Sequence, residues 1–529
     1  MFYSAYARRG LVVAPHQLAA QAGAAVLREG GDAIEATVAA AAVSAVVCPH
    51  VGGLGGDGFW LIHEPGRTPI AIEAAGVAGR QVTAELYRGL GLTESPQRGP
   101  LSCNTVAGAL AGWSSALAVS RGWGGRLPVR RLLEEAICHA RDGVPVSAGQ
   151  AAAIAAEAGD LPTEPAFARI YLPGGVLPNP GAFMDQPALA RCLERLAAAG
   201  LDDFYRGDVA VALALDLQAA GSPLTRDDLA GHYAQLVEPL AVRLANAVVY
   251  SLPPPTQGLA TLMILGLFDR LNVAEAEGAA HVHGLIEATK HAIRVRDGYV
   301  TDPFYMAVEA RDFLLPEVLN EVAAVIEPGH ARPWVGSVDR GRSIWLGAID
   351  AAGRTVSTMQ SLCWGFGSGV MLERTGVVWH NRGVGFSLQP AAVNHLISGR
   401  KPFHTLNPML AVFDDGRAMG FGAMGGQSVI QAQAAVFSRY ARFGQGLQAA
   451  VTAPRWVLGA GGGSETPDLH LESRFAPDTV QALREAGHPL DVVEPFSESM
   501  DPVGAVVRHA SGTLEAATDP RSEAAVAAW

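Results

Sequence analysis

The stretch around Ser343 constrains the fold of this chain more than any other. A polar run that contains proline and glycine, residues 328–342, ends abruptly at Ser343. An apolar segment, 344–349, follows, and the turn Asp350-Ala351-Ala352-Gly353 leads into a second strand-like segment, 354–362. Asp-x-x-Gly between two such segments predicts a β-hairpin. The sequence therefore places a hydroxyl residue at the start of a strand, directly after an irregular segment.

A hydroxyl residue in this position predicts self-cleavage. If the bond between Arg342 and Ser343 broke, Ser343 would become a new N-terminus, and its own α-amine could act as general base for its hydroxyl. A free α-amine has a pKa of roughly 7.7–8.0, which is close to working pH. This is the arrangement of an N-terminal-nucleophile hydrolase before processing. A serine that merely begins an ordinary hairpin is the alternative.

The composition limits what the chain can be. Its 529 residues are too many for one simple core and predict two or more folding units, or one large interleaved unit. A hydrophobic content of 49% with 17% charged residues describes a globular protein. The net charge of −12 argues against nucleic acid and anionic membranes as partners.

Signals for targeting, membrane insertion and metal binding are sparse. No hydrophobic segment of signal-peptide length follows the first residues. The most apolar stretch, 33–48, contains Glu35 and is too short to span a bilayer, so it predicts a buried helix. The five cysteines show neither paired spacing nor a metal pattern: Cys48, Cys103, Cys138, Cys192 and Cys363. We therefore expect a cytoplasmic protein without a metal site, while a homo-oligomer stays open.

The two parts of the chain differ in texture. Before Ser343 the patterns predict mainly helices, among them 16–29, 33–47, 186–199, 259–271 and 280–297. After it, short predicted strands alternate with glycine turns, among them 344–349, 354–362, 409–413 and 418–422. We expect the charged side chains of the helix 280–297 to form one solvent-exposed face. The change of texture is consistent with a precursor whose two pieces share a sheet sandwich.

A glycine-rich segment, 52–58 (GGLGGDG), only superficially resembles a phosphate-binding loop. It lacks the Gly-Lys-Ser/Thr ending, and it leads into a predicted strand, 59–63, instead of a helix. We interpret its glycines as allowing close approach of two backbones in a turn.

Eight segments, in order along the whole chain, resemble the γ-glutamyltranspeptidase superfamily. They are residues 17–19 (QLA), 27–33 (LREGGDA), 49–59 (PHVGGLGGDGF), 105–108 (TVAG), 253–256 (PPPT), 302–303 (DP), 425–426 (GG) and 519–522 (DPRS). Each segment alone is weak, whereas their order and spacing are specific. The resemblance implies an α+β fold, a four-layer αββα sandwich of the N-terminal-nucleophile hydrolase type. It also implies self-cleavage into a large subunit, 1–342, and a small subunit, 343–529, and amide-bond chemistry without a cofactor.

The resemblance assigns catalytic roles to four residues. Ser343 falls where the family keeps a nucleophilic threonine, and because serine lacks the methyl group that restricts χ1, we expect a cost in activity. Ser361 matches a second threonine, which supports the amine or hydroxyl of the nucleophile by hydrogen bonding. Gly425 and Gly426 match the glycine pair whose N–H groups bind the oxyanion, and each such donor is worth on the order of 10²–10³ in rate.

The substrate-binding positions depart from the family. Arg80 matches the arginine that grips a substrate carboxylate. Arg382 stands in the segment that carries the acid for the glutamyl α-amino group, where that acid is missing, and it could hold the substrate carboxylate together with Arg80. His404 and Thr405 fall near the family's Ser-Ser pair, and Cys363 falls at its asparagine. Because a site without the acid should not favour an ammonium group, we expect a small-molecule amide that carries a carboxylate and no α-amino group.

Three functions stay open. The patterns Ser-x-Trp-x-Gly at 343–347 and Phe-Gly-Ser-Gly at 366–369 resemble the oxamate amidohydrolase branch, which implies hydrolysis of an oxamate-like amide through an acyl-enzyme. Trp345 in the first pattern has core packing as its alternative. A γ-glutamyltransferase or glutathione hydrolase is the second function, and it would need another acid, such as Asp414 or Glu373. An uncleaved, non-catalytic family member is the third.

Overall fold

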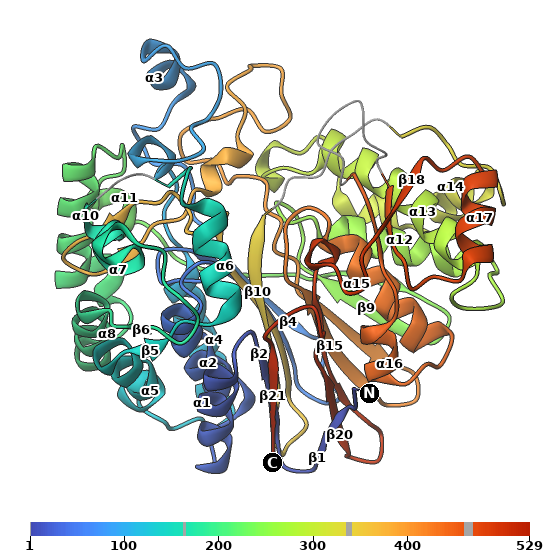
Figure 1. The fold of residues 1–529 in the computed structure, drawn as a ribbon, viewed down its shortest axis with the longest axis horizontal. Helices are drawn as coiled ribbons and strands as arrows, with labels where there is room; N and C mark the ends of the chain where they lie inside the picture. The colour runs from blue at the N-terminus through green and yellow to red at the C-terminus, as the bar shows by residue number, and fades with distance from the viewer. Residues whose placement is uncertain (1, 162–164, 335–340, 460–468) are drawn as a thin grey trace.

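Two seven-stranded antiparallel sheets lie face to face at the centre of the molecule, and helices cover the outer face of each (Figure 1). The computed structural model describes residues 2–161, 165–334, 341–459 and 469–529. Residues 335–340, which belong to the irregular segment predicted before Ser343, lie outside the described residues. The predicted four-layer αββα sandwich of the α+β class is confirmed.

Both sheets combine strands from the two sides of Ser343. The first sheet has the order β21 (Ala525–Ala528), β2 (Leu11–Ala14), β10 (Arg342–Ile349), β11 (Thr355–Cys363), β3 (Asp57–His63), β4 (Ile70–Ala74) and β7 (Gln235–Val237). The second has the order β1 (Ala5–Ala7), β20 (Leu514–Ala517), β19 (Val503–Arg508), β15 (Ala418–Ala423), β14 (Met409–Phe413), β9 (Ala247–Ser251) and β8 (Leu240–Arg243). The segments before and after Ser343 therefore form one interleaved unit.

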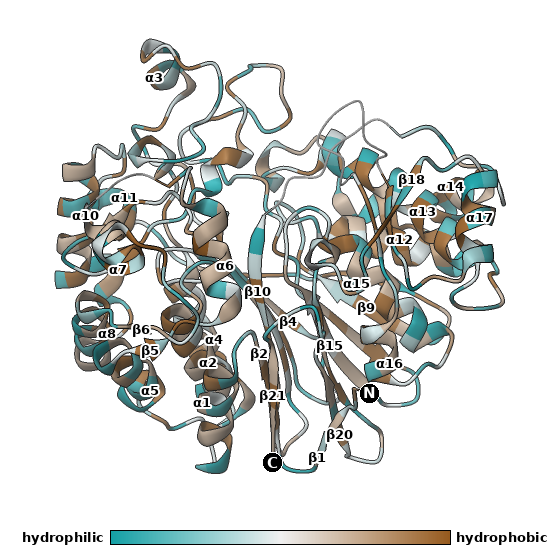
Figure 2. Ribbon diagram, in the orientation of Figure 1, coloured by the Kyte–Doolittle hydropathy of each residue, from teal (hydrophilic) through white to brown (hydrophobic). Residues whose placement is uncertain are grey.

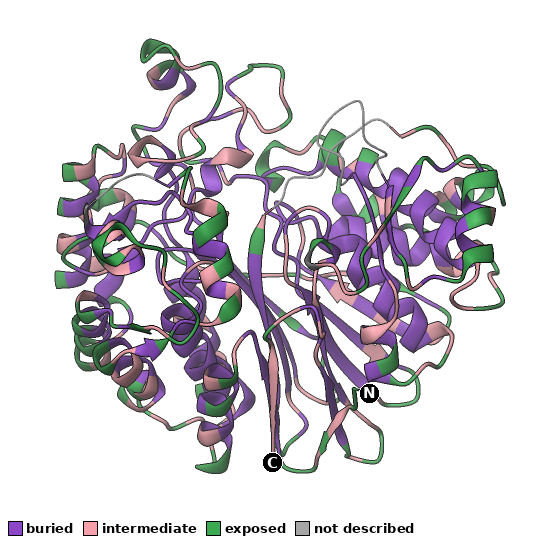
Figure 3. Ribbon diagram, viewed as in Figure 1, coloured by how far each residue is buried: buried purple, intermediate pink, exposed green. Residues whose placement is uncertain are grey.

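Two groups of helices bury apolar faces against the sheets. On the first sheet lie α1 (Gln17–Arg28), α2 (Ala33–Val47) and α4 (Ala109–Gly122), with α5 (Val129–Asp142) and α8 (Pro187–Ala199) packed outside them. On the second lie α12 (Gly258–Arg270), α15 (Val429–Phe437) and α16 (Leu447–Thr452), with α13 (Ala279–Tyr299), α14 (Pro316–Ala324) and α17 (Pro477–Glu485) packed outside them. Figures 2 and 3 show that the strands are largely buried, whereas hydrophilic, exposed residues gather on the outer helices.

The remaining α-helices and strands lie outside these two groups. They are the helices α3 (Ala84–Gly89), α6 (Ala148–Glu157), α7 (Pro165–Tyr171), α9 (Asp203–Arg206), α10 (Asp208–Ala220) and α11 (Arg226–Ala230), and the strands β5 (Val144–Pro145), β6 (Phe183–Met184), β12 (Met371–Leu372), β13 (Val377–Val378), β16 (Trp456–Leu458), β17 (Leu469–Glu472) and β18 (Leu490–Val493). Within the part of the chain that the structure describes, no helix combines the length and apolar character that crossing a membrane requires.

Helix α2 is buried along its whole length, as the sequence predicts. Asp32 caps its first turn through Oδ1, which accepts hydrogen bonds from the N–H groups of Ile34 and Glu35, while Glu35 Oε2 accepts one from the N–H of Asp32. The other carboxylate oxygen of Glu35 accepts a hydrogen bond from the N–H of Leu127. This reciprocal cap satisfies polar groups that burial would otherwise leave unpaired.

Trp345 fills the space between the two sheets. Its ring is 2% exposed, and its Nε1–H donates to Ser357 Oγ at 2.9 Å. Gly347, Gly422 and Gly504 surround the ring so closely that an added Cβ would lie 2.1–2.5 Å from its atoms. Core packing, the alternative stated for Trp345, is therefore its role, and the glycines are needed because the indole occupies the space of their side chains.

The charges of α13 contradict the expected solvated face. Glu287 and Lys290 form a buried ion pair at 2.6 Å, and Arg296 is only 1% exposed. The prediction was wrong because a residue count along one helix does not show what packs against it. Here the polar side chains of α13 meet backbone carbonyls and side chains of other segments, for example Arg332 O and Gln257 Oε1.

We expect Gly422→Ala to destabilise the protein by about 1–3 kcal/mol, because the new methyl group overlaps the Trp345 ring and overpacks the core. Thermal unfolding of purified protein measures the effect as a fall in Tm. Gly298→Ala in α13 is the matched control, since a Cβ there meets no atom within 4 Å. Equal Tm values for the two variants would contradict the role assigned to the Trp345 cage.

Candidate active site

The candidate active site lies where three neighbouring strands begin or end. Ser343 lies at the start of β10, Ser361 near the end of β11, and Asp57 at the start of β3. Ser361 and Asp57 are direct partners in the ladder, and the pairing of β10 with β11 shifts register between Arg342 and Ile344. The loops after β15 and before β14, in the second sheet, meet these residues through hydrogen bonds of Ser343 and His404.

The Ser343 side chain is held by one residue of the predicted oxyanion turn. Its hydroxyl, 3% exposed, donates to Gly425 O at 3.0 Å and accepts from the Gly425 N–H at 3.1 Å. Gly426 lies beside it and accepts a hydrogen bond from Gln257 Nε2 at 3.0 Å. The structure thus brings the predicted nucleophile to the predicted glycine pair, with one backbone N–H already directed at the hydroxyl.

Ser361 contacts the bond predicted to break. Its hydroxyl donates to the carbonyl oxygen of Arg342 and accepts from the Cys363 N–H at 2.7 Å. The sequence predicts a hydrogen bond from this residue to the amine or hydroxyl of Ser343. In the intact chain the partner is instead the adjacent carbonyl, and a donor there can stabilise negative charge that develops on that oxygen.

The guanidinium of Arg382 is buried, and no counter-ion for it lies among the residues that the structure describes. It is 4% exposed, and its Nη1 donates a long hydrogen bond of 3.4 Å to Thr405 Oγ1. Its Nε is buried without a partner, and across the described ranges no carboxylate lies within ion-pair distance of the guanidinium. Because burying an unpaired charge is costly, binding an anion next to this guanidinium would be favourable.

Gln257, which the sequence did not single out, links Thr405, the partner of Arg382, to Gly426, which follows the partner of Ser343. Its amide nitrogen donates to Thr405 O at 2.8 Å and to Gly426 O at 3.0 Å. Thr405 in turn accepts from Arg382. The side chain follows the predicted Pro-rich segment 253–256, but nothing in the local pattern distinguishes it from an ordinary loop glutamine.

A buried carboxylate, Asp57, lies between two histidines. Its Oδ1 accepts from the N–H groups of Gly76 and Gly108, and its Oδ2 accepts from His404 Nε2 at 3.1 Å and lies 3.4 Å from His380 Nδ1. Burial raises the pKa of Asp57, but His380 and the hydrogen bond from His404 outweigh it and hold the carboxyl ionised. Oδ1 thus accepts two hydrogen bonds and Oδ2 one, so both carboxylate oxygens of Asp57 are engaged within the protein.

His404 is neutral at working pH. Burial lowers its pKa to about 4, although the hydrogen bond to Asp57 opposes the shift. Its Nε2–H donates to Asp57 and its Nδ1 accepts from the Leu406 N–H, which fixes the tautomer. The predicted pair His404 and Thr405 therefore has two tasks: His404 anchors the loop to Asp57, and Thr405 carries the contact to Arg382.

The glycine-rich segment brings Asp57 into place. An added Cβ at Gly56 would lie 2.2 Å from the Ser361 carbonyl oxygen, and one at Gly55 would lie 2.2 Å from that of Val378. Close backbone approach, the interpretation drawn from the sequence, is confirmed. The strand begins at Asp57, two residues before the predicted start at Phe59, so Asp57 belongs to the sheet and not to the loop.

Arg80 lies apart from this group. It is exposed, its backbone N–H donates to Asp228, and it lines a cavity of about 260 Å³ together with His232 and Lys401. Within the described chain its guanidinium makes no hydrogen bond or ion pair, and it makes no polar contact with the residues around Ser343. Its role in gripping a substrate carboxylate stays a prediction.

One cluster outside the site has metal-binding side chains. His283, Glu287 and His488 offer ligand atoms within 4.8 Å of one another. His283 Nε2–H donates to Glu327 O, and its Nδ1 lies 2.8 Å from His488 Nε2. Lys290 already neutralises Glu287, so a divalent cation would leave excess positive charge in a buried place. We interpret the cluster as a structural link between α13 and the turn after α17.

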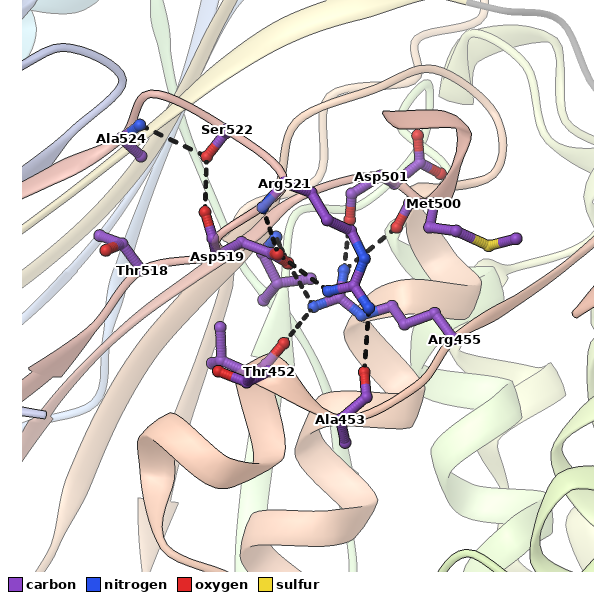
Figure 4. A network of polar contacts seen from close by, with 12 residues as sticks. Thr452, Ala453, Arg455, Met500, Asp501, Thr518, Asp519, Arg521, Ser522 and Ala524 are labelled. Carbon is purple, nitrogen blue, oxygen red and sulfur yellow. Dashed lines mark hydrogen bonds and ion pairs between the residues drawn. The ribbon is translucent and has the colours of Figure 1, made fainter. Parts of the chain in front are cut away.

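A buried ionic network, shown in Figure 4, reaches the predicted oxyanion turn through Asp501, which lies against Gly425. Arg455 pairs with Asp519 and donates to the backbone oxygen of Asp501 at 2.6 Å, while Asp519 also pairs with Arg521 at 2.9 Å. The Asp501 carboxylate lies against Gly425, where an added Cβ would be 2.0 Å from Oδ1. The Asp501 carboxylate is therefore one reason why position 425 is glycine, in addition to the space that a substrate would need.

The position of Asp501 predicts a pH dependence of stability. Burial raises the pKa of its carboxyl to about 6, so the folded state binds this proton more tightly than the unfolded state. The corresponding stability is present below pH ~4 and is lost as the pH rises through about 6. The free energy of unfolding of Asp501→Asn, relative to that of wild type, should therefore rise by up to about 2 kcal/mol between pH 4 and pH 7.5.

Urea unfolding at the two pH values measures this difference. Asp491→Asn, at an exposed position of β18, is the matched control. A difference between wild type and Asp501→Asn that stays constant with pH would contradict the assignment.

Comparisons with known proteins agree with this arrangement. A family model described as gamma-glutamyltranspeptidase matches residues 19–529. An oxamate amidohydrolase proenzyme of Klebsiella pneumoniae is 48% identical over 530 residues, which cover 100% of both chains. A glutathione hydrolase-like proenzyme, YwrD, of Bacillus subtilis is 34% identical and covers 97% of both chains.

A solved structure agrees as well. The crystal structure of cephalosporin acylase from Bacillus halodurans aligns with a TM-score of 0.91 and 30% identity, covering 100% of this chain and 97% of that one. These relatives are enzymes that hydrolyse or transfer amide bonds, and this chain is one as well. With the αββα sandwich, the match over residues 19–529 and a full-length relative at 48% identity, the chain belongs to the gamma-glutamyltranspeptidase family.

Proposed function

We propose that the chain is a self-processing amidohydrolase that acts on a small amide bearing a carboxylate, with oxamate as the first substrate to test. The observation that carries the proposal is Arg382, a buried guanidinium that has no counter-ion among the described residues and is connected through Thr405 and Gln257 to the turn that holds Ser343. The relative that is 48% identical over the full chain bears the name oxamate amidohydrolase, which supports the same substrate class.

Self-processing begins at the Arg342–Ser343 bond. Ser343 Oγ attacks the Arg342 carbonyl carbon, the C–N bond breaks, and an ester to Oγ forms with a free α-amine. The Ser361 hydroxyl, which donates to this carbonyl oxygen, stabilises the charge that develops on it. Water then hydrolyses the ester, releases the Arg342 carboxylate and leaves Ser343 as the N-terminus of the small subunit.

Turnover uses the same groups again. The substrate carboxylate pairs with Arg382, and the Ser343 hydroxyl attacks the amide carbonyl while the α-amine takes its proton. The N–H of Gly425 donates to the oxyanion, and Gly426 lies beside it. The amine returns the proton to the leaving ammonia, and water releases the acyl group.

A glutathione hydrolase is less well supported, because the acids that it would need lie elsewhere. Asp414 pairs with Arg243 at 2.6 Å, and Glu373 pairs with Arg169 at 2.9 Å. All four side chains are more than half exposed. Asp57 already accepts hydrogen bonds from Gly76, Gly108 and His404, so both of its carboxylate oxygens are engaged within the protein.

Self-processing gives one test of the proposed function. Wild-type protein should give two bands on a denaturing gel, with a new N-terminus at Ser343, whereas Ser343→Ala should remain a single chain. Ser361→Ala should slow processing by about 10²-fold, because it removes one donor to the Arg342 carbonyl. Ser511→Ala, at an exposed position, should process like wild type. A single full-length band for wild type would favour an uncleaved, non-catalytic protein.

The second prediction concerns Arg382. In Arg382→Met, kcat/KM for oxamate should fall by about 10²-fold through loss of charge-assisted hydrogen bonds, while that for acetamide, which lacks the carboxylate, should change little. The variant should be at least as stable as wild type in thermal unfolding, because an unpaired buried charge is removed. Faster hydrolysis of γ-glutamyl-p-nitroanilide than of oxamate by processed wild type would refute the proposed substrate class.

A further inference from the structure

The side chain before the predicted cleavage point has a partner of its own. Arg342 extends its guanidinium from the start of β10, and its Nε lies 3.8 Å from Glu157 Oε1. Glu157 is the last residue of α6, and its side chain is 16% exposed, against 45% for Arg342. A largely buried carboxylate is thus presented to the residue whose carbonyl carbon would be attacked.

The Glu157 carboxylate is fixed without help from Arg342. Arg98 donates to Glu157 Oε2 and also to the carbonyl oxygens of Gly365 and Gly367. The fit at Gly365 is close, since an added Cβ would lie 2.3 Å from Glu157 Oε1. Three hydrogen bonds from one planar guanidinium therefore hold the carboxylate and the turn in a single geometry.

The turn held by Arg98 is the one that ends β11. It contains Cys363 and Phe366, both with positive φ (81° and 54°), a conformation that side chains rarely adopt unless the surroundings enforce it. Ser361 lies just before this turn, and its hydroxyl contacts the Arg342 carbonyl. Arg342 is consequently held at two points from one support: its carbonyl by Ser361 and its guanidinium by Glu157.

We propose that Glu157 is a positioning residue for self-cleavage, which orients the Arg342–Ser343 peptide by binding the Arg342 side chain. The inference rests on the proposed function, because it requires that Ser343 attack this bond. The reaction itself is unchanged: the C–N bond breaks and the ester to Ser343 Oγ forms, while Glu157 exchanges no proton. The contact matters before cleavage, since afterwards Arg342 is a chain end free to leave. It also makes position 342 selective for a cation.

The experiment compares rates of conversion of full-length precursor into two subunits, followed on denaturing gels. Glu157→Gln and Arg342→Gln should each slow conversion about tenfold, because a loosely held peptide spends less time in the geometry for attack. The double variant should be no slower than either single one, since both changes remove the same contact. Arg342→Lys, which keeps the charge, should restore most of the wild-type rate.

Glu373→Gln is the matched control, because it removes an exposed glutamate that also pairs with an arginine. It should convert at the wild-type rate. Conversion of Arg342→Gln at the wild-type rate, or additive losses in the double variant, would overturn the role of Glu157 while leaving the proposed function intact. Because the Arg342 side chain is 45% exposed, its variants should fold. The conversion rate of Arg342→Gln therefore tests the role of Glu157 even if Glu157→Gln is unstable. Absence of cleavage in wild type would overturn the proposed function and this inference together.

Discussion

The face-to-face packing of the two sheets is the constraint on which the rest of the structure depends. Trp345 fills the space between them, and glycines from β10, β15 and β19 leave room for its ring. This packing decides which strand ends lie level with one another. Ser343 at the start of β10 can reach Gly425 after β15 only because the sheets are held at this separation and angle. The site is therefore a consequence of the core.

The electrostatics of the site follow from how its charges are distributed. Asp57 has partners for both carboxylate oxygens, and the ionic network around Asp519 is closed in the same way. Arg382 differs from these carboxylates: among the described residues, its buried guanidinium donates one hydrogen bond, to the Thr405 hydroxyl, and has no counter-ion. Paired carboxylates stabilise the fold, whereas the buried guanidinium of Arg382 retains an attraction for an anion. That contrast is the physical basis of the proposed preference for a carboxylate-bearing substrate over one that presents an ammonium group.

Much of the fold could be predicted from the sequence, and the omissions share a cause. Strand 409–413 agrees with β14 at both ends, and helix 33–47 agrees with α2. Both have strong local patterns, an apolar run and a capped alanine-rich stretch. The strands β7, β8 and β16 to β18 were not predicted, because three or four residues carry too little periodicity. The burial of Glu287 and Lys290 was also missed, since it depends on segments distant in sequence.

The sequence by itself determined the nucleophile candidate, the glycine pair and the missing acid, because each is a residue type at a recognisable place in the chain. Only the tertiary structure decided which of these groups meet. It joined Arg382 to Ser343 through Gln257, placed Asp57 beside His404, and left Arg80 on a separate cavity. The physical reason is that contacts between strands and loops far apart in the chain arise from packing, and local sequence patterns do not encode them.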